Sequence, residues 1–105
     1  MQYRQGDVFV EKVKALPKSA RLVDRKDKRI VLAYGEATGH AHAIHESFVE
    51  LYEDDNGIYW LRIPEGKNLA TLVHEEHDTI NLKPGIWRVN RQREYSPDKI
   101  RVVYD

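Results

Sequence analysis

The stretch "SFVELYEDDNGIYWLRI", residues 47–63, decides the fold of this chain. Two runs rich in aromatic and β-branched residues, which are typical of strands, flank the sequence "DDNG" at 54–57. Asn-Gly is a preferred pair for a tight hairpin turn, because both central residues of that turn need a positive φ. The stretch therefore predicts an antiparallel hairpin that turns at Asp55–Gly57.

Short runs of strand-forming residues, bounded by Gly, Pro, Asn and Asp, continue on both sides of this hairpin. Outside the hairpin, the predicted strands are 5–13, 29–37, 69–73, 79–82, 86–95 and 100–104. Such spacing is typical of small antiparallel folds. We therefore predict a mainly β fold, a small antiparallel β-roll, barrel or sandwich, with at most one or two short helices, placed within 15–28.

Length and composition limit the classes of function. The chain has 105 residues and zero formal net charge, which predicts a single domain over 1–105 that binds neither duplex DNA nor a membrane. It has no cysteine, which excludes disulfides, thiolate metal sites and thiol nucleophiles. The beginning of the chain lacks the apolar run of a signal peptide, so we expect a cytoplasmic protein.

The histidines raise the main functional question, because all five occur in two short windows, "GEATGHAHAIHE" at 35–46 and "LVHEEHD" at 72–78. If the first window is extended, His40, His42 and Glu46 share one face of a strand. His45 then lies on the other face.

The second window offers further candidates. His74 and His77 are three residues apart and share a face only in a turn or a single helical turn. We expect at least one of them close to His40 and His42, with Glu46 or Glu75 nearby.

Two chemistries suit such a site. Neutral imidazoles coordinate zinc, iron, manganese or nickel. Without a metal, a histidine can act as a general acid or base. Gly35 and Gly39 bracket "EAT" directly before the first cluster and allow a ligand to approach the main chain, and Thr38 adds a hydroxyl.

The strand predicted at 86–95 carries a second anomaly. Trp87 and Val89 should face the core, and the same face continues with Arg91 and Arg93. A guanidinium on a core-facing stripe requires an anionic partner, and it pairs well with phosphate or carboxylate. We therefore expect Arg91 or Arg93 to point into the histidine site and bind phosphate, unless they pair with protein carboxylates.

Residues 40–46, "HAHAIHE", resemble the first metal motif of the cupins, in which two histidines one residue apart are followed by a glutamate. This resemblance implies the cupin fold. It also implies a divalent metal held by His40, His42 and Glu46.

A broader resemblance covers most of the chain. The motifs "QGDV", "GEATGHAH", "LVHEEH", "PG" and "RQREYSP" resemble a family of small proteins of bacteria and their phages, associated with ring nucleases, which are dimeric enzymes that cleave cyclic oligoadenylates in antiviral defence. This resemblance implies metal-free cleavage without a cofactor. The catalytic candidates are His40, His42, Glu46, His74 and His77, and the ligand-binding candidates are Thr38, Gly39, Arg88, Arg91, Arg93 and Tyr95.

Three hypotheses follow. The first is a metal-independent phosphodiesterase in which histidines transfer protons and arginines stabilise the phosphate. The second is a cupin-like metal protein, and the third is a non-enzymatic binding module of defence or phage origin. Zero net charge favours a small nucleotide or cyclic oligonucleotide over a long RNA, and a symmetric ligand would suit a homodimer.

Overall fold

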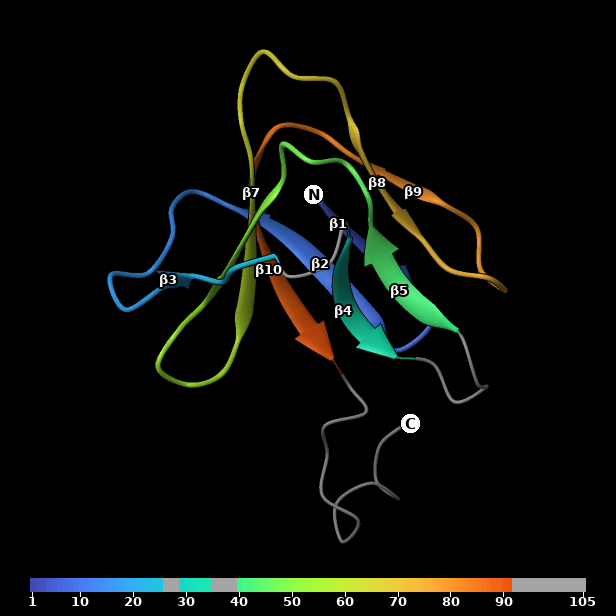
Figure 1. Ribbon diagram of the computed structural model, residues 1–105, viewed down its shortest axis with the longest axis horizontal. Coiled ribbons are helices and arrows are strands. Elements are labelled where there is room, and N and C mark those ends of the chain that lie inside the picture. Colours follow the sequence, from blue (N-terminus) through green and yellow to red (C-terminus); the bar gives the residue numbers. More distant parts are fainter. Residues whose placement is uncertain (26–28, 35–39, 92–105) are drawn as a thin grey trace, which may run out of the picture.

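The structure, a computed structural model, describes residues 1–25, 29–34 and 40–91. Over these ranges the chain forms strands and no helix (Figure 1). The strands are β1 (Gln2–Gln5), β2 (Val8–Val13), β3 (Arg21–Leu22), β4 (Ile30–Tyr34), β5 (Ala41–Ile44), β6 (Glu50–Glu53), β7 (Tyr59–Ile63), β8 (Ala70–Val73), β9 (Ile80–Leu82) and β10 (Gly85–Arg91). The described part also contains no helix long and apolar enough to cross a membrane.

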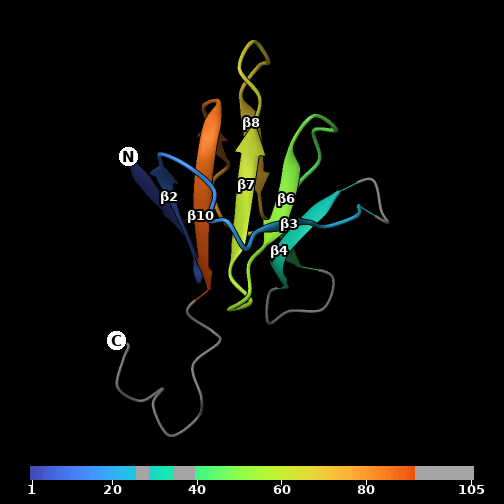
Figure 2. The same ribbon diagram turned by 90° about the vertical axis from the view of Figure 1, so that its left-hand side faces the viewer.

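These strands form two antiparallel sheets. The six-stranded sheet has the order β1-β2-β10-β7-β6-β3, and the four-stranded sheet has the order β4-β5-β8-β9. Figure 2 shows the larger sheet toward the viewer, with β4 and β8 behind it. Both sheets contribute to one core, which includes Val10, Leu32, Ile44, Leu61 and Trp87. The prediction of a mainly antiparallel β fold is confirmed.

The hairpin predicted at 55–57 joins β6 to β7. Its turn differs from the predicted one, because Gly57 (φ 78°) has a positive φ and Asn56 does not. Gly57 N donates to Asp54 O at 3.0 Å, and Asp54 N donates to Ile58 O at 3.0 Å, so three residues form the loop. Such a loop needs only one left-handed residue, which is the glycine.

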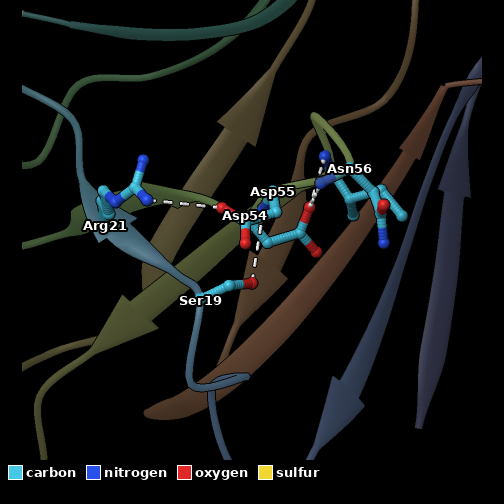
Figure 3. Close-up of polar contacts among 6 residues, drawn as sticks. Ser19, Arg21, Asp54, Asp55 and Asn56 are labelled. Atoms are coloured by element: carbon cyan, nitrogen blue, oxygen red, sulfur yellow. Dashed lines mark hydrogen bonds and ion pairs between the residues drawn. The ribbon is translucent and has the colours of Figure 1, made fainter.

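Side chains reinforce this turn. The Asp54 carboxylate accepts the N–H groups of Asn56 and Ile58 at 2.8 and 3.0 Å. Figure 3 shows that the hairpin also contacts the segment that leads into β3: Ser19 Oγ accepts Asp55 N–H, and Arg21 contacts the Asp55 carboxylate. The segment 19–21 is thereby attached to the tip of the hairpin.

The helix expected within 15–28 does not occur in 15–25; residues 26–28 lie outside the described ranges. Instead, Arg21 and Leu22 form the short edge strand β3 beside β6. Val23 N donates to Leu51 O at 2.8 Å, and the Val23 side chain packs against the core. Sheet pairing and burial of one valine thus override the helical preference of this polar segment.

The strand predicted over 5–13 is a hairpin in the structure. Gly6 (φ 57°) turns the chain between β1 and β2, which pair from Gln5↔Val8 to Gln2↔Glu11. A glycine followed by an aspartate fits a strand end or a turn, and the sequence pattern did not separate the two.

This turn lies at one end of the sandwich, called here the histidine end. At this end β5 begins and β8, β4 and β10 finish, since Ala33 pairs with His42 and Arg91 pairs with Val8. The predicted strand at 100–104, and residues 92–95, lie outside the described ranges.

Candidate metal centre

Four histidines lie together at the histidine end of the sandwich. The His74 ring is central: its centroid lies 4.3 Å from that of His42, 4.6 Å from His77 and 5.6 Å from His40. The His42 and His77 centroids are 5.9 Å apart. The predicted proximity of the two sequence clusters is therefore confirmed, although the catalytic roles assigned to these residues stay predictions.

Strand parity places the first cluster. On β5, His42 and Ile44 face the core, and His42 is only 4% exposed. His40 directly precedes this strand, two residues before His42, so it shares the same face at the strand's edge. His74 and His77 come from the loop between β8 and β9, which passes beside the start of β5.

A buried glutamine holds His42 in place. Gln5 Nε2 donates to Leu72 O and Asp78 O, both at 2.9 Å. Its Oε1 therefore faces His42 Nδ1 at 2.8 Å and must accept that nitrogen's proton. This bond fixes the tautomer of neutral His42, with the proton on Nδ1 and a lone pair on Nε2.

Gly6, next to Gln5 in the chain, lies directly against the histidine cluster. A Cβ at position 6 would lie 2.7 Å from His77 Nε2 and 3.2 Å from His42 Cε1. The turn between β1 and β2 therefore lies against two imidazoles, and a residue without a side chain is needed there for close approach as well as for the positive φ.

The tautomer of His74 is also set by a local bond. Glu76 N donates to His74 Nδ1 at 3.0 Å, so a neutral His74 carries its proton on Nε2. A metal bound at Nδ1 would take the lone pair that accepts this bond. A metal bound at Nε2 would move the proton to Nδ1. Metal binding at either nitrogen therefore replaces the bond to Glu76.

His40, His74 and Glu75 offer three ligand atoms that all lie within 4.8 Å of one another. Ala41 N donates to Glu75 Oε1 at 2.9 Å, which holds this carboxylate beside the start of β5. This hydrogen bond lowers the pKa of Glu75 below its ordinary value, and His40 and His74 act in the same direction. His40 Nδ1 also lies 3.5 Å from Glu76 Oε2.

Two residues of the first window, His45 and Glu46, lie away from the four clustered histidines. Glu46 is bound by Thr71, whose N–H and hydroxyl donate to its two oxygens at 3.1 and 2.7 Å. This contact is at the opposite end of β5 from His40, so the cupin-like set of His40, His42 and Glu46 is not assembled. His45 lies on the other face of β5 from His42, as strand parity predicted, in a groove with Ala41 and Ala43.

The arginines are divided between the two faces of β10. Arg91 faces inward with Trp87 and Val89, as predicted, and its contacts include Leu32 O at 3.5 Å and the Tyr59 ring at 4.6 Å. Arg88 lies on the outer face, over the Trp60 ring, and its buried Nε has no hydrogen-bond partner within the described residues.

The candidate role of Arg88 in ligand binding at the histidine site therefore needs correction: β10 places its side chain on the face away from the histidines. Thr38, Gly39, Arg93 and Tyr95 lie outside the described ranges. Gln5 and Gly6 were not predicted to belong to the site. The available signal was a polar residue directly before a glycine, at the start of an alternating run.

The comparisons with known proteins place the chain in a family without assigning a function. No curated protein and no solved structure matches it. Residues 4–92 match the model of a domain of unknown function, DUF8820. That match includes β2 to β10 and both histidine windows, and so this chain belongs to the DUF8820 family.

Proposed function

We propose that this protein binds a divalent transition-metal ion through His40, His74 and Glu75. The observation that carries the proposal is the convergence of two imidazoles and one carboxylate, with ligand atoms within 4.8 Å of one another. Ligand atoms of a tetrahedral zinc ion are about 3.3 Å apart, given bonds of about 2.0–2.1 Å. The exposed Glu75 and the half-buried imidazoles therefore need to close by about 1.5 Å, which side-chain rotations can supply.

The chemistry of these ligands suits Zn²⁺, Mn²⁺, Fe²⁺ or Ni²⁺ more than Ca²⁺, because imidazole nitrogen is a poor ligand for the harder cation. Three protein ligands leave coordination positions for water or substrate, as in catalytic zinc sites. A metal held in this way lowers the pKa of bound water and polarises bound oxygen atoms. The proposed centre is thus suited to hydrolysis or to Lewis-acid chemistry.

His42 strengthens the proposal. Its Nδ1–H bond to Gln5 is the kind of outer contact that orients metal-ligating histidines and leaves Nε2 able to coordinate. Its ring centroid lies 4.3 Å from that of His74, so His42 is placed to act as a hydrogen-bond partner of a water bound to the metal.

Calorimetric titration of protein without a histidine tag tests the proposal. We expect stoichiometric binding of Zn²⁺ or another divalent transition metal, and at least a tenfold weaker affinity in His74→Ala, because a ligand is lost. His45→Ala is the matched control, since His45 lies on the other face of β5. Absence of binding, or an equal effect of the two substitutions, would contradict the proposal.

The metal-independent phosphodiesterase is the second candidate. The observation that favours it is the inward-facing Arg91, which lies at the same end of the sandwich as the histidines. On this hypothesis Arg91→Ala weakens binding of a cyclic oligonucleotide, and His40→Ala or His42→Ala slows cleavage by about 10²–10⁴-fold, as expected for loss of a general acid or base.

Single-turnover cleavage of cyclic and linear oligoadenylates, with and without a chelator, separates the two candidates. Activity that persists in chelator supports the phosphodiesterase and excludes a role for the metal in it. Activity that depends on added metal supports the metal centre. No cleavage in either condition removes the phosphodiesterase and leaves the binding measurement above to decide on the metal.

A further inference from the structure

A groove of about 230 Å³ lies on the outer face of the four-stranded sheet. Ala41 and Ala43 form its floor. Side chains alternate along β5, so these two alanines face outward while His42 and Ile44 face the core. Val73, which pairs with Ala43 across the sheet, forms part of one wall. The two alanines are 2% and 1% exposed.

The groove has two chemically different ends. His74 and Glu75, two of the three proposed metal ligands, line one end. Arg29 and His45 line the other end, where they are neighbours because Ile30 pairs with Ile44. The floor between these ends follows β5 over about four residues, or about 13 Å at the usual rise of a strand.

Arg29 is the residue that indicates a ligand in this groove. It is half-buried, and within residues 1–25, 29–34 and 40–91 no hydrogen bond or ion pair engages its guanidinium. A half-buried guanidinium without a counter-charge is unfavourable, and a bidentate oxyanion is its best-fitting partner. His45 beside it can donate a further hydrogen bond to the same group.

We infer that this groove binds a small organic anion, a carboxylate or phosphate ester, whose acidic group pairs with Arg29 and whose other end reaches the metal site. The contact of the ligand with the metal site rests on the proposed metal centre, whereas the pairing of its acidic group with Arg29 does not. A groove of this volume admits a small molecule and not a folded partner. A ligand that spans it is held at the acidic end and presents its far end to the open coordination positions beside His74 and Glu75.

The test is a nuclear magnetic resonance titration that follows the amides of Ala41, Ala43 and Val73. The probes are acetate, succinate, inorganic phosphate and glycerol 3-phosphate, each with metal-free and zinc-loaded protein. We expect these three amides to shift together at millimolar probe. Succinate should bind more tightly than acetate only in the zinc-loaded form, because only succinate has a second group for the metal. The phosphate and carboxylate arms identify which oxyanion the groove takes.

Arg29→Ala should weaken anion binding by about tenfold or more, as expected for loss of a charge-assisted bidentate contact. Arg21→Ala is the matched control, because that guanidinium is exposed and contacts only the Asp55 carboxylate among the described residues. Val73→Phe should fill the groove and abolish binding. Both Arg29→Ala and Val73→Phe should keep the zinc affinity of the unaltered protein, since neither residue is a proposed ligand.

The outcomes separate this inference from the proposed function. Zinc binding without Arg29-dependent anion binding, or no binding of any probe, overturns the groove ligand and leaves the metal centre standing. Arg29-dependent anion binding in a protein that binds no metal supports the anion end and overturns the link to the metal. Anion binding that is equal in Arg29→Ala and Arg21→Ala overturns the role of Arg29.

Discussion

Gln5 Oε1 accepts the Nδ1 proton of His42 at 2.8 Å, across 37 residues of sequence, and the two residues are only 2% and 4% exposed. The same glutamine donates to two main-chain carbonyls, Leu72 O and Asp78 O, which lie on either side of the loop that carries His74 and His77. One side chain thus connects β1, β5 and the loop between β8 and β9. It fixes the position of both histidine clusters and the tautomer of the buried imidazole.

Gln5→Leu should therefore reduce both stability and metal affinity. The substitution removes the donor to Leu72 O and Asp78 O and the acceptor for His42 Nδ1, so we expect a loss of at least about 2 kcal/mol in the free energy of unfolding. Metal affinity should fall by about 10–100-fold, as is usual when the outer partner of a ligating histidine is removed. Urea unfolding and zinc titration measure the two effects.

Gln2→Leu is the control for this substitution, because Gln2 is an exposed residue of the same strand. Equal unfolding free energies for the two variants would show that the buried hydrogen bonds of Gln5 contribute little.

Gly6→Ala should be more harmful than the same substitution at Gly66. Both glycines have a positive φ, of 57° and 84°, so both variants carry the backbone strain of about 1–2 kcal/mol. At Gly66 a Cβ meets no atom within 4 Å, whereas at Gly6 it would lie 2.7 Å from His77 Nε2. The difference between the two unfolding free energies isolates the clash with the imidazole.

Adding His77→Ala to Gly6→Ala should recover most of that difference, because the clashing atoms are removed. If the double variant is no more stable than Gly6→Ala alone, the close approach of the turn to His77 is not what constrains position 6.

The strands, and the faces of β5 on which its histidines lie, were predictable because both depend on local patterns. Alternating apolar residues and turn residues define the strands, and the two-residue period puts His42 inward and His45 outward. The same period correctly placed Arg91 on the face of Trp87 and Val89.

The partners of these side chains were not predictable, because they depend on how distant strands are placed. Glu46 has the spacing of a metal ligand, yet β5 ends at Ile44 and Thr71 of the neighbouring strand binds both Glu46 oxygens. The contact between Gln5 and His42 requires the turn at Gly6, and the sequence pattern alone fits a continuous strand there equally well.

Metal binding should be visible at the amide of Glu76. That N–H donates to His74 Nδ1, and coordination at either ring nitrogen replaces the bond. We therefore expect a large change in the Glu76 amide resonance when zinc is added, with little change at Gly66, which lies in a turn at the other end of β8. A zinc-loaded protein in which the Glu76 resonance stays unchanged would exclude His74 from the ligand set.

The contact between Thr71 and Glu46 should make stability depend on pH. Burial raises the pKa of Glu46, but hydrogen bonds from the Thr71 hydroxyl and N–H outweigh burial, and the pKa lies below its ordinary value of 4.5. A carboxyl group whose pKa is lower in the folded state stabilises the protein above the unfolded pKa. That contribution is lost as the pH falls through the folded pKa.

Thr71→Val removes the hydroxyl and keeps the shape and the N–H. At neutral pH we expect it to lower the free energy of unfolding by about 1–2 kcal/mol, because the lost bond is charge-assisted. The difference from the unaltered protein should shrink once the pH is well below 4.5, where Glu46 is protonated in both. Thr79→Val, at an exposed threonine, is the control and should show no such pH dependence. Urea unfolding at neutral and acidic pH measures both, and a Thr71→Val deficit that stays constant across this range would mean that the bond does not depend on the charge of Glu46.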